Sequence, residues 1–194
     1  MSVREIVRQR AAVGTADYTV AGTSYWSNSQ IDDVLARNRR LVVEEPIEWI
    51  RQTAPGGGAS YALAEFYSLA GMIEPGGPGT AGTMIDPSTG GTITGWTIDQ
   101  TGLVTFAADT GGTVVPRFTG YVYDVNGAAA EVLETYAAHV ADQDDFSTDD
   151  QSFSRSQKHP MLLAQAARLR ERSAGFGVTE TIPSYRDDLN PSWR

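Results

Sequence analysis

"GYVYDVNGAAAEVLETYAAHV", residues 120–140, changes its hydrophobic period part-way along. The residues up to Asp124 close an alternating strand, and from Val125 the apolar residues recur at spacings of three, four and seven. This spacing predicts an amphipathic helix with Asp124 as its N-cap. The small side chains of Ala128, Ala129 and Ala130 allow a neighbouring helix to approach closely. A strand is therefore expected to run directly into a long helix.

Two helices are predicted in the first 40 residues. The first is expected to end near Gly14. Its apolar stripe comprises Val3, Ile6, Val7 and Ala11. The second is expected to start from Ser27 or Ser29 as its N-cap. Its buried face comprises Ile31, Val34 and Leu35. A charge order that suits the helix dipole is expected in its end turns, with acids in the first and bases in the last. These residues are Asp32, Asp33, Arg37, Arg39 and Arg40.

A last helix is predicted after residue 154. Ser154 and Gln157 form a possible capping box, and Gly175 is the expected stop. Pro160 is expected in or near the first turn, since elsewhere it would kink the helix. The residues expected to face inward are Leu162, Leu163, Ala166 and Leu169.

Residues 41–124 are glycine-rich and alternate in hydrophobicity, which predicts a mainly antiparallel β subdomain of about five strands. Segments 41–52 and 60–74 are expected to be two strands joined by a glycine-rich turn. Pro116 suggests an edge strand or a bulge. The fold class is therefore α+β, with a helical core of about four helices and an inserted antiparallel β subdomain. The expected division is a discontinuous helical core of 1–40 and 125–175, an insertion of 41–124 and an extended C-terminal arm of 176–194.

The composition of the chain excludes several classes of protein function. The chain has 194 residues, a net charge of −9 and no cysteine. Disulfide scaffolds and thiolate chemistry are excluded, and an acidic protein is a poor electrostatic partner for nucleic acid. No apolar run approaches the ~20 residues that span a bilayer, and the N-terminus lacks a signal-peptide core. The protein is expected to be made in a cytoplasm, with no membrane partner.

Known catalytic and metal-binding patterns are missing from the sequence. The acidic segment 142–150 fails the EF-hand spacing in both registers, and no nucleophile elbow or zinc-binding helix occurs. His139 is expected to form a plain surface pair with Asp142. Glycoside hydrolysis stays open, because its two carboxylates can lie far apart in sequence. We expect a protein that is not an enzyme and uses no cofactor or metal.

Three groups of residues are candidates for an interface. Phe146 and Phe153 can pin the 145–158 loop between the last two helices. Arg155, Arg168, Arg170 and Arg172 form a basic face, which is either solvated or the intersubunit partner of the acidic 142–150 loop. The arm is either a frayed end or a segment that docks on another subunit. Its aromatic residues are Phe176, Tyr185 and Trp193.

Residues 120–173 resemble the C-terminal half of head–tail connector proteins of tailed bacteriophages, also called adaptor or head-completion proteins. The likeness lies in the "YVYD" strand, the alanine-rich helix, the "DFSTDDQSFSRSQK" loop and the arginine-rich final helix. The segment "YWSNSQIDDVLARNR" is similar to an early helix of that family. The glycine-rich middle of the chain departs from the compact members of the family.

The resemblance implies a structural virion protein in the neck between head and tail. Such a protein forms a ring of itself, typically a dodecamer, beneath the portal protein, and docks the next neck or tail protein. Genomic DNA would pass through its lumen without specific binding.

Two alternatives remain. One is a tail-terminator or stopper protein of the same neck. The other is a glycan-binding or glycan-cleaving β module with Trp26, Trp49 and Trp96 as sugar platforms.

Overall fold

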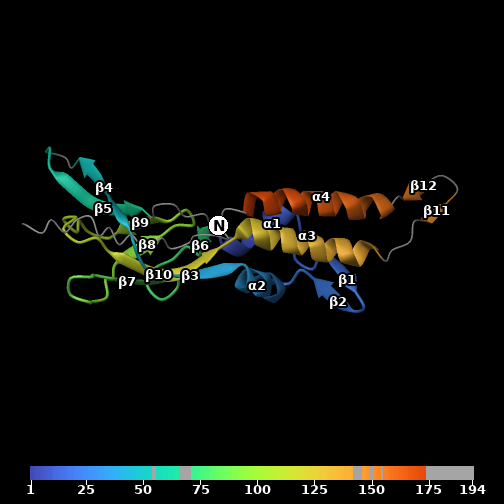
Figure 1. Ribbon diagram of the computed structural model, residues 1–194, viewed down its shortest axis with the longest axis horizontal. Coiled ribbons are helices and arrows are strands. Elements are labelled where there is room, and N and C mark those ends of the chain that lie inside the picture. Colours follow the sequence, from blue (N-terminus) through green and yellow to red (C-terminus); the bar gives the residue numbers. More distant parts are fainter. Residues whose placement is uncertain (54–55, 66–70, 142–145, 149–150, 154, 174–194) are drawn as a thin grey trace, which may run out of the picture.

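The structure, a computed structural model, describes residues 1–53, 56–65, 71–141, 146–148, 151–153 and 155–173. Within them, four helices and twelve strands form an elongated molecule (Figure 1). Most strands lie at one end, the helices lie in the middle, and a short hairpin lies at the other end. The predicted α+β class is confirmed. The helices are α1 (Val3–Ala11), α2 (Asn28–Arg37), α3 (Val125–Ala141) and α4 (Arg155–Ser173).

The first two helices bury the predicted stripes, and each begins with a capping box. Ser2 and Glu5 cap α1, and Ser27 and Gln30 cap α2, so that two N-terminal N–H groups are satisfied at each start. The expected charge order of α2 is confirmed only for Arg37 in the last turn, because the first turn holds no acid. The helix begins at Asn28, which places Asp32 beyond the first turn, and it ends at Arg37, before the arginines of the next strand.

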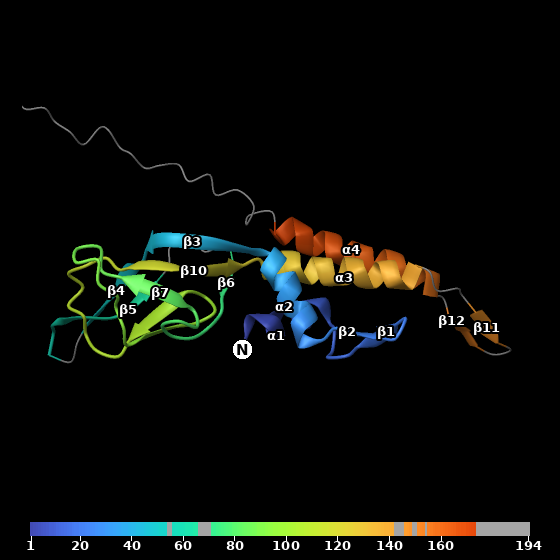
Figure 2. The same ribbon diagram turned by 90° about the horizontal axis from the view of Figure 1, so that it is seen from below.

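Helices α3 and α4 are antiparallel and lie side by side in both views (Figures 1 and 2). Ala128, Ala129 and Ala130 are fully buried, as expected for a close helix contact. In α4, Leu162, Ala166 and Leu169 are buried as predicted. Leu163 is 40% exposed, so its prediction as an inward residue is wrong. It follows Leu162 by about 100° around the helix and so falls outside the stripe. Pro160 lies inside α4, beyond its first turn.

The region between α2 and α3 contains eight strands rather than about five. In the first sheet β10 is central, with β3 on one edge and both β6 and β7 on the other. The second sheet has the order β4-β5-β9-β8, and all these pairs are antiparallel. The strands are β3 (Arg39–Pro46), β4 (Glu48–Thr53), β5 (Ala59–Glu65), β6 (Met72–Ile73), β7 (Gly82–Ile85), β8 (Trp96–Ile98), β9 (Leu103–Phe106) and β10 (Arg117–Tyr123).

The single strand expected over 41–52 is two strands in different sheets. The chain changes sheet at Ile47, which is fully buried and donates its N–H to the carbonyl of Pro116 over 3.0 Å. Pro116 precedes β10, a central strand, so the edge-strand interpretation is wrong. A bulge does occur nearby. Two residues of β3, Val43 and Glu44, lie opposite Thr119, and Glu44 has a φ of 52°.

The buried apolar residues form two clusters. One joins the four helices, and the other lies among the strands from Ile47 to Val122. The expected boundaries of the β insertion stay a prediction, although these clusters divide the chain at similar places.

The ring of Phe118 in the strand cluster packs beside two glycines that are cross-strand partners, Gly82 and Gly120. A Cβ on Gly120 would lie 2.4 Å from the ring and 2.7 Å from the carbonyl of Ala81, so no larger residue fits there.

We expect Gly120→Ala to destabilise the fold by about 1–3 kcal/mol, because the added carbon overfills a packed site. Urea unfolding followed by circular dichroism measures this loss. Gly14→Ala is the control, since its Cβ would meet only the Asp17 carboxylate at 3.5 Å. Equal free energies of unfolding for the two variants would contradict the packing argument.

Candidate interaction site

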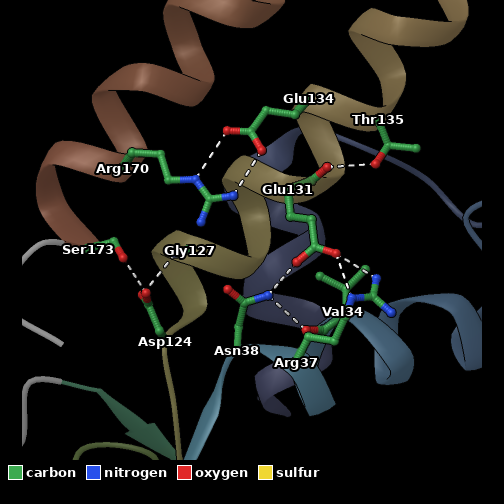
Figure 3. A network of polar contacts seen from close by, with 10 residues as sticks. All are labelled: Val34, Arg37, Asn38, Asp124, Gly127, Glu131, Glu134, Thr135, Arg170 and Ser173. Carbon is green, nitrogen blue, oxygen red and sulfur yellow. Dashed lines mark hydrogen bonds and ion pairs between the residues drawn. The ribbon is translucent and has the colours of Figure 1, made fainter. Parts of the chain in front are cut away.

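A polar joint forms where the strands meet the helices, and Asp124 is its centre (Figure 3). This carboxylate is only 7% exposed. It accepts hydrogen bonds from the N–H groups of Asn126 and Gly127 at 3.1 and 2.8 Å, which confirms its predicted role as the N-cap of α3. Ser173, at the end of α4, donates its hydroxyl to the other carboxylate oxygen. The N–H of Asp124 donates to the carbonyl of Asn38 over 2.8 Å. One residue thus connects β10, α3, the end of α2 and the end of α4.

Two ion pairs extend the joint along α3. Glu131 accepts from Arg37 and Asn38 at 2.7 and 2.6 Å, which ties α2 to α3. Glu134 accepts two hydrogen bonds from Arg170 at 3.1 and 2.8 Å. This hydrogen-bonded contact raises the pKa of Arg170. The last turns of α4 are therefore held against α3 by a bidentate contact (Figure 3).

The opposite flank of this part of α4 forms a basic pocket. Arg168 and Arg172 of α4 and Arg10 of α1 line a concavity of about 450 Å³. Its other described lining residues are Asn126, Gln165 and Leu169, none of which is a carboxylate. In the part of the chain that the structure describes, the carboxylates form ion pairs with Arg4, Arg37, Arg117 and Arg170, and with none of the three pocket arginines.

The electrostatics of the pocket favour an anion. Burial lowers the pKa of Arg10, and the nearby charge of Arg172 lowers it further. Arg10 donates to the side-chain oxygen of Asn126, a neutral group, and the nearby charge of Asp124 offsets part of the lowering of its pKa. Guanidinium groups bind carboxylate or phosphate through paired hydrogen bonds. The arrangement can therefore bind a carboxylate or phosphate supplied from outside.

The far end of the α3–α4 pair carries a hairpin, where the sequence predicted only a loop. Strands β11 (Phe146–Thr148) and β12 (Gln151–Phe153) pair antiparallel beyond the helix ends (Figure 2). Phe146 and Phe153 are cross-strand partners. The predicted packing of these two side chains lies outside the described part of the chain, as do the side chain of Arg155, the Ser154 cap and the Gly175 stop. The arm residues Phe176, Tyr185 and Trp193 also lie outside it.

An aromatic cluster that the sequence did not predict packs around His139. The hairpin of β1 (Tyr18–Val20) and β2 (Thr23–Tyr25) lies against α3, and the Tyr18 ring stacks on Tyr136 at 4.3 Å. The Tyr18 hydroxyl contacts Nδ1 of His139 at 2.9 Å. Burial raises the pKa of Tyr18, and the neighbouring tyrosines raise it further. His139 is therefore no plain surface residue, and its predicted pairing with Asp142 lies outside the described residues. Tyr136 and His139 share a face at a spacing of three, but the tyrosines of the β1–β2 hairpin that pack on them are over 100 residues away in sequence.

Two of the three proposed sugar platforms do not form, and the third, Trp49, is half-buried. Trp26 and Trp96 are 3% and 2% exposed, so neither can stack on a sugar ring. Trp49 packs on Phe106 at 4.7 Å and donates its N–H to the carbonyl of Val114. Among the described residues, no three His, Cys, Asp or Glu side chains gather as a metal site would require. None of the helices in the same residues is both long and apolar enough to cross a membrane.

Comparisons of the chain with protein-family models, curated proteins and solved structures give no match.

We expect Asp124→Ala to lower the free energy of unfolding by about 1–2 kcal/mol for the lost cap alone. Asp124→Asn should lower the free energy of unfolding by less, because an amide oxygen can still accept the hydrogen bonds from the two helix N–H groups. Asp33→Ala, which removes an exposed carboxylate, is the control. Thermal and urea unfolding measure the differences. If all three variants unfolded alike, Asp124 would not be the centre of the joint.

Proposed function

We propose that this protein is a structural virion protein, a head–tail adaptor that forms a ring beneath the portal of a tailed bacteriophage. The ring extends the DNA channel and docks the next neck or tail protein. The role needs no catalysis and no cofactor. The protein would be assembled in the host cytoplasm and would act in the virion neck.

The observation that carries the proposal is that the residues of the resemblance form one continuous unit. Residues 120–173 comprise the end of β10, helix α3, the β11–β12 hairpin and helix α4. The polar joint fixes both helix ends at the base of this unit. A rigid helix pair with its hairpin at the free end suits a protein that contacts copies of itself and partners above and below.

Charge supports the same role. The chain carries a net charge of −9. DNA must slide through a neck during ejection, and an acidic lumen repels its phosphates. The basic residues of the α4 flank then suit protein contacts better than DNA contacts.

The test is negative-stain electron microscopy of the purified protein mixed with the portal protein of the same virus. We expect rings stacked on one face of the portal, with a single copy number. Rings on the tail tube and not on the portal would instead favour the tail-terminator or stopper alternative.

A control with an unrelated portal protein should give no stacked rings. If the chain stayed a lone monomer with its own portal at every concentration tried, the adaptor proposal would be wrong.

A further inference from the structure

We infer that the pocket of Arg10, Arg168 and Arg172 is the receptor for the acidic hairpin segment 142–150 of a second copy of this chain. The inference rests on the proposed ring and names the contact that holds its copies together. The ligand class is a set of peptide carboxylates.

The described part of the chain supplies no carboxylate to the lining of the pocket. Arg172 lies close enough to Arg10 to disfavour the charge of Arg10. Asp124, the nearest buried carboxylate, already accepts from two helix N–H groups and from Ser173. Like charges held together are costly in the free subunit and become favourable when an acidic partner is added.

The acidic segment of the same chain belongs to the opposite end of α4 from this pocket. It joins the C-terminal end of α3 to the start of α4, whereas the pocket lies near the end of α4. From Arg155 to Arg168 and Arg172 the helix rises about 20–26 Å. The hairpin also extends away from the helices (Figures 1 and 2). This separation favours a contact between copies.

The side of α4 that carries the pocket arginines complements the acidic segment in charge and also offers apolar surface. Met161, Arg168 and Arg172 are spaced by seven and four residues, so they lie on one side of the helix. Met161 is 61% exposed and provides apolar surface at the hairpin end of that side. The segment 142–153 likewise combines apolar residues with charges, here acidic ones, because Phe146 lies between its acids and Phe153 follows them. Those acids are Asp142, Asp144, Asp145, Asp149 and Asp150.

A contact between unlike surfaces of identical chains repeats from copy to copy. Because the pocket and the hairpin are different surfaces, the contact is heterologous, and it forms a closed ring when its rotation closes. Phosphates of DNA could also bind arginines, but the net charge of −9 works against attraction of DNA to the whole molecule.

The test is a charge swap scored by rings on the portal. The pocket variant Arg168→Glu with Arg172→Glu should need about tenfold more protein to form rings, or should form none. The hairpin variant Asp149→Lys with Asp150→Lys should fail likewise. An equal mixture of the two variants should form rings, because each pocket then faces a hairpin of opposite charge. A chain with both changes should also recover.

Arg51→Glu, an exposed change outside the pocket, is the charge control and should assemble normally. The free energy of unfolding of the pocket variant should be at least that of the native chain, since the repulsion between the pocket arginines is removed. Raising the salt to about 1 M should weaken native rings, because it shortens the screening length to about 3 Å.

Several outcomes would overturn the inference and leave the adaptor proposal standing. One is that the pocket variant forms normal rings. Another is that Asp187→Lys with Asp188→Lys, used in place of the hairpin change, restores ring formation to the pocket variant. The third is that the pocket variant loses binding to duplex DNA while its assembly is unchanged. Failure of the native chain to form rings would instead count against the adaptor function itself.

Discussion

The arrangement of the molecule depends on the hydrogen bonds that the buried Asp124 makes. The buried hydrophobic residues form two separate clusters, and only the partly buried Met72 and Tyr123 of the adjoining sheet pack against the helical one, so burial fixes the helices relative to the strands only weakly. The chain crosses between them at the start of β3 and the end of β10, and Asp124 bonds at this crossing to α3, to Asn38 and to the last residue of α4. Directional hydrogen bonds therefore set an orientation that the non-directional hydrophobic effect leaves open.

The same joint restricts the sequence around it. A Cβ on Gly127 would lie 2.3 Å from a carboxylate oxygen of Asp124 and 2.9 Å from the side-chain oxygen of Asn38. A glycine in a helix costs about 1 kcal/mol relative to alanine, yet only glycine leaves space for the carboxylate here. The glycine thus lowers the local helix propensity of α3 but leaves room for the contact that joins β10, α3 and the end of α2. The alanines that follow serve the same close approach, since they are fully buried between the helices.

Sequence periodicity predicted the helices well because each presents one apolar stripe to a common core. The N-caps Ser27 and Asp124 could also be predicted, because an N-cap bonds to N–H groups only two or three residues further along the chain. The β region was predicted poorly because its pairing is not local. Leu41 pairs with Tyr121, and the chain changes sheet at Ile47 within one apolar run. The basic face was visible in sequence. That Arg168 and Arg172 share a pocket with Arg10, while Arg170 pairs with Glu134, depends on how α4 rotates against α1 and α3.

The helix pair acts as a spacer between two unlike charges. Helix α4 has 19 residues and is about 28 Å long, and this length separates the acidic hairpin from the arginine pocket. A copy that places its hairpin in the next copy's pocket must be displaced by a comparable distance. It cannot be related to that copy by a twofold axis through this contact, because a twofold contact joins identical surfaces. In the ring that we propose, rotation about a common axis would satisfy both conditions, and the α3–α4 pair, held at its base by Asp124 and Arg170, would keep the rotation the same at every contact.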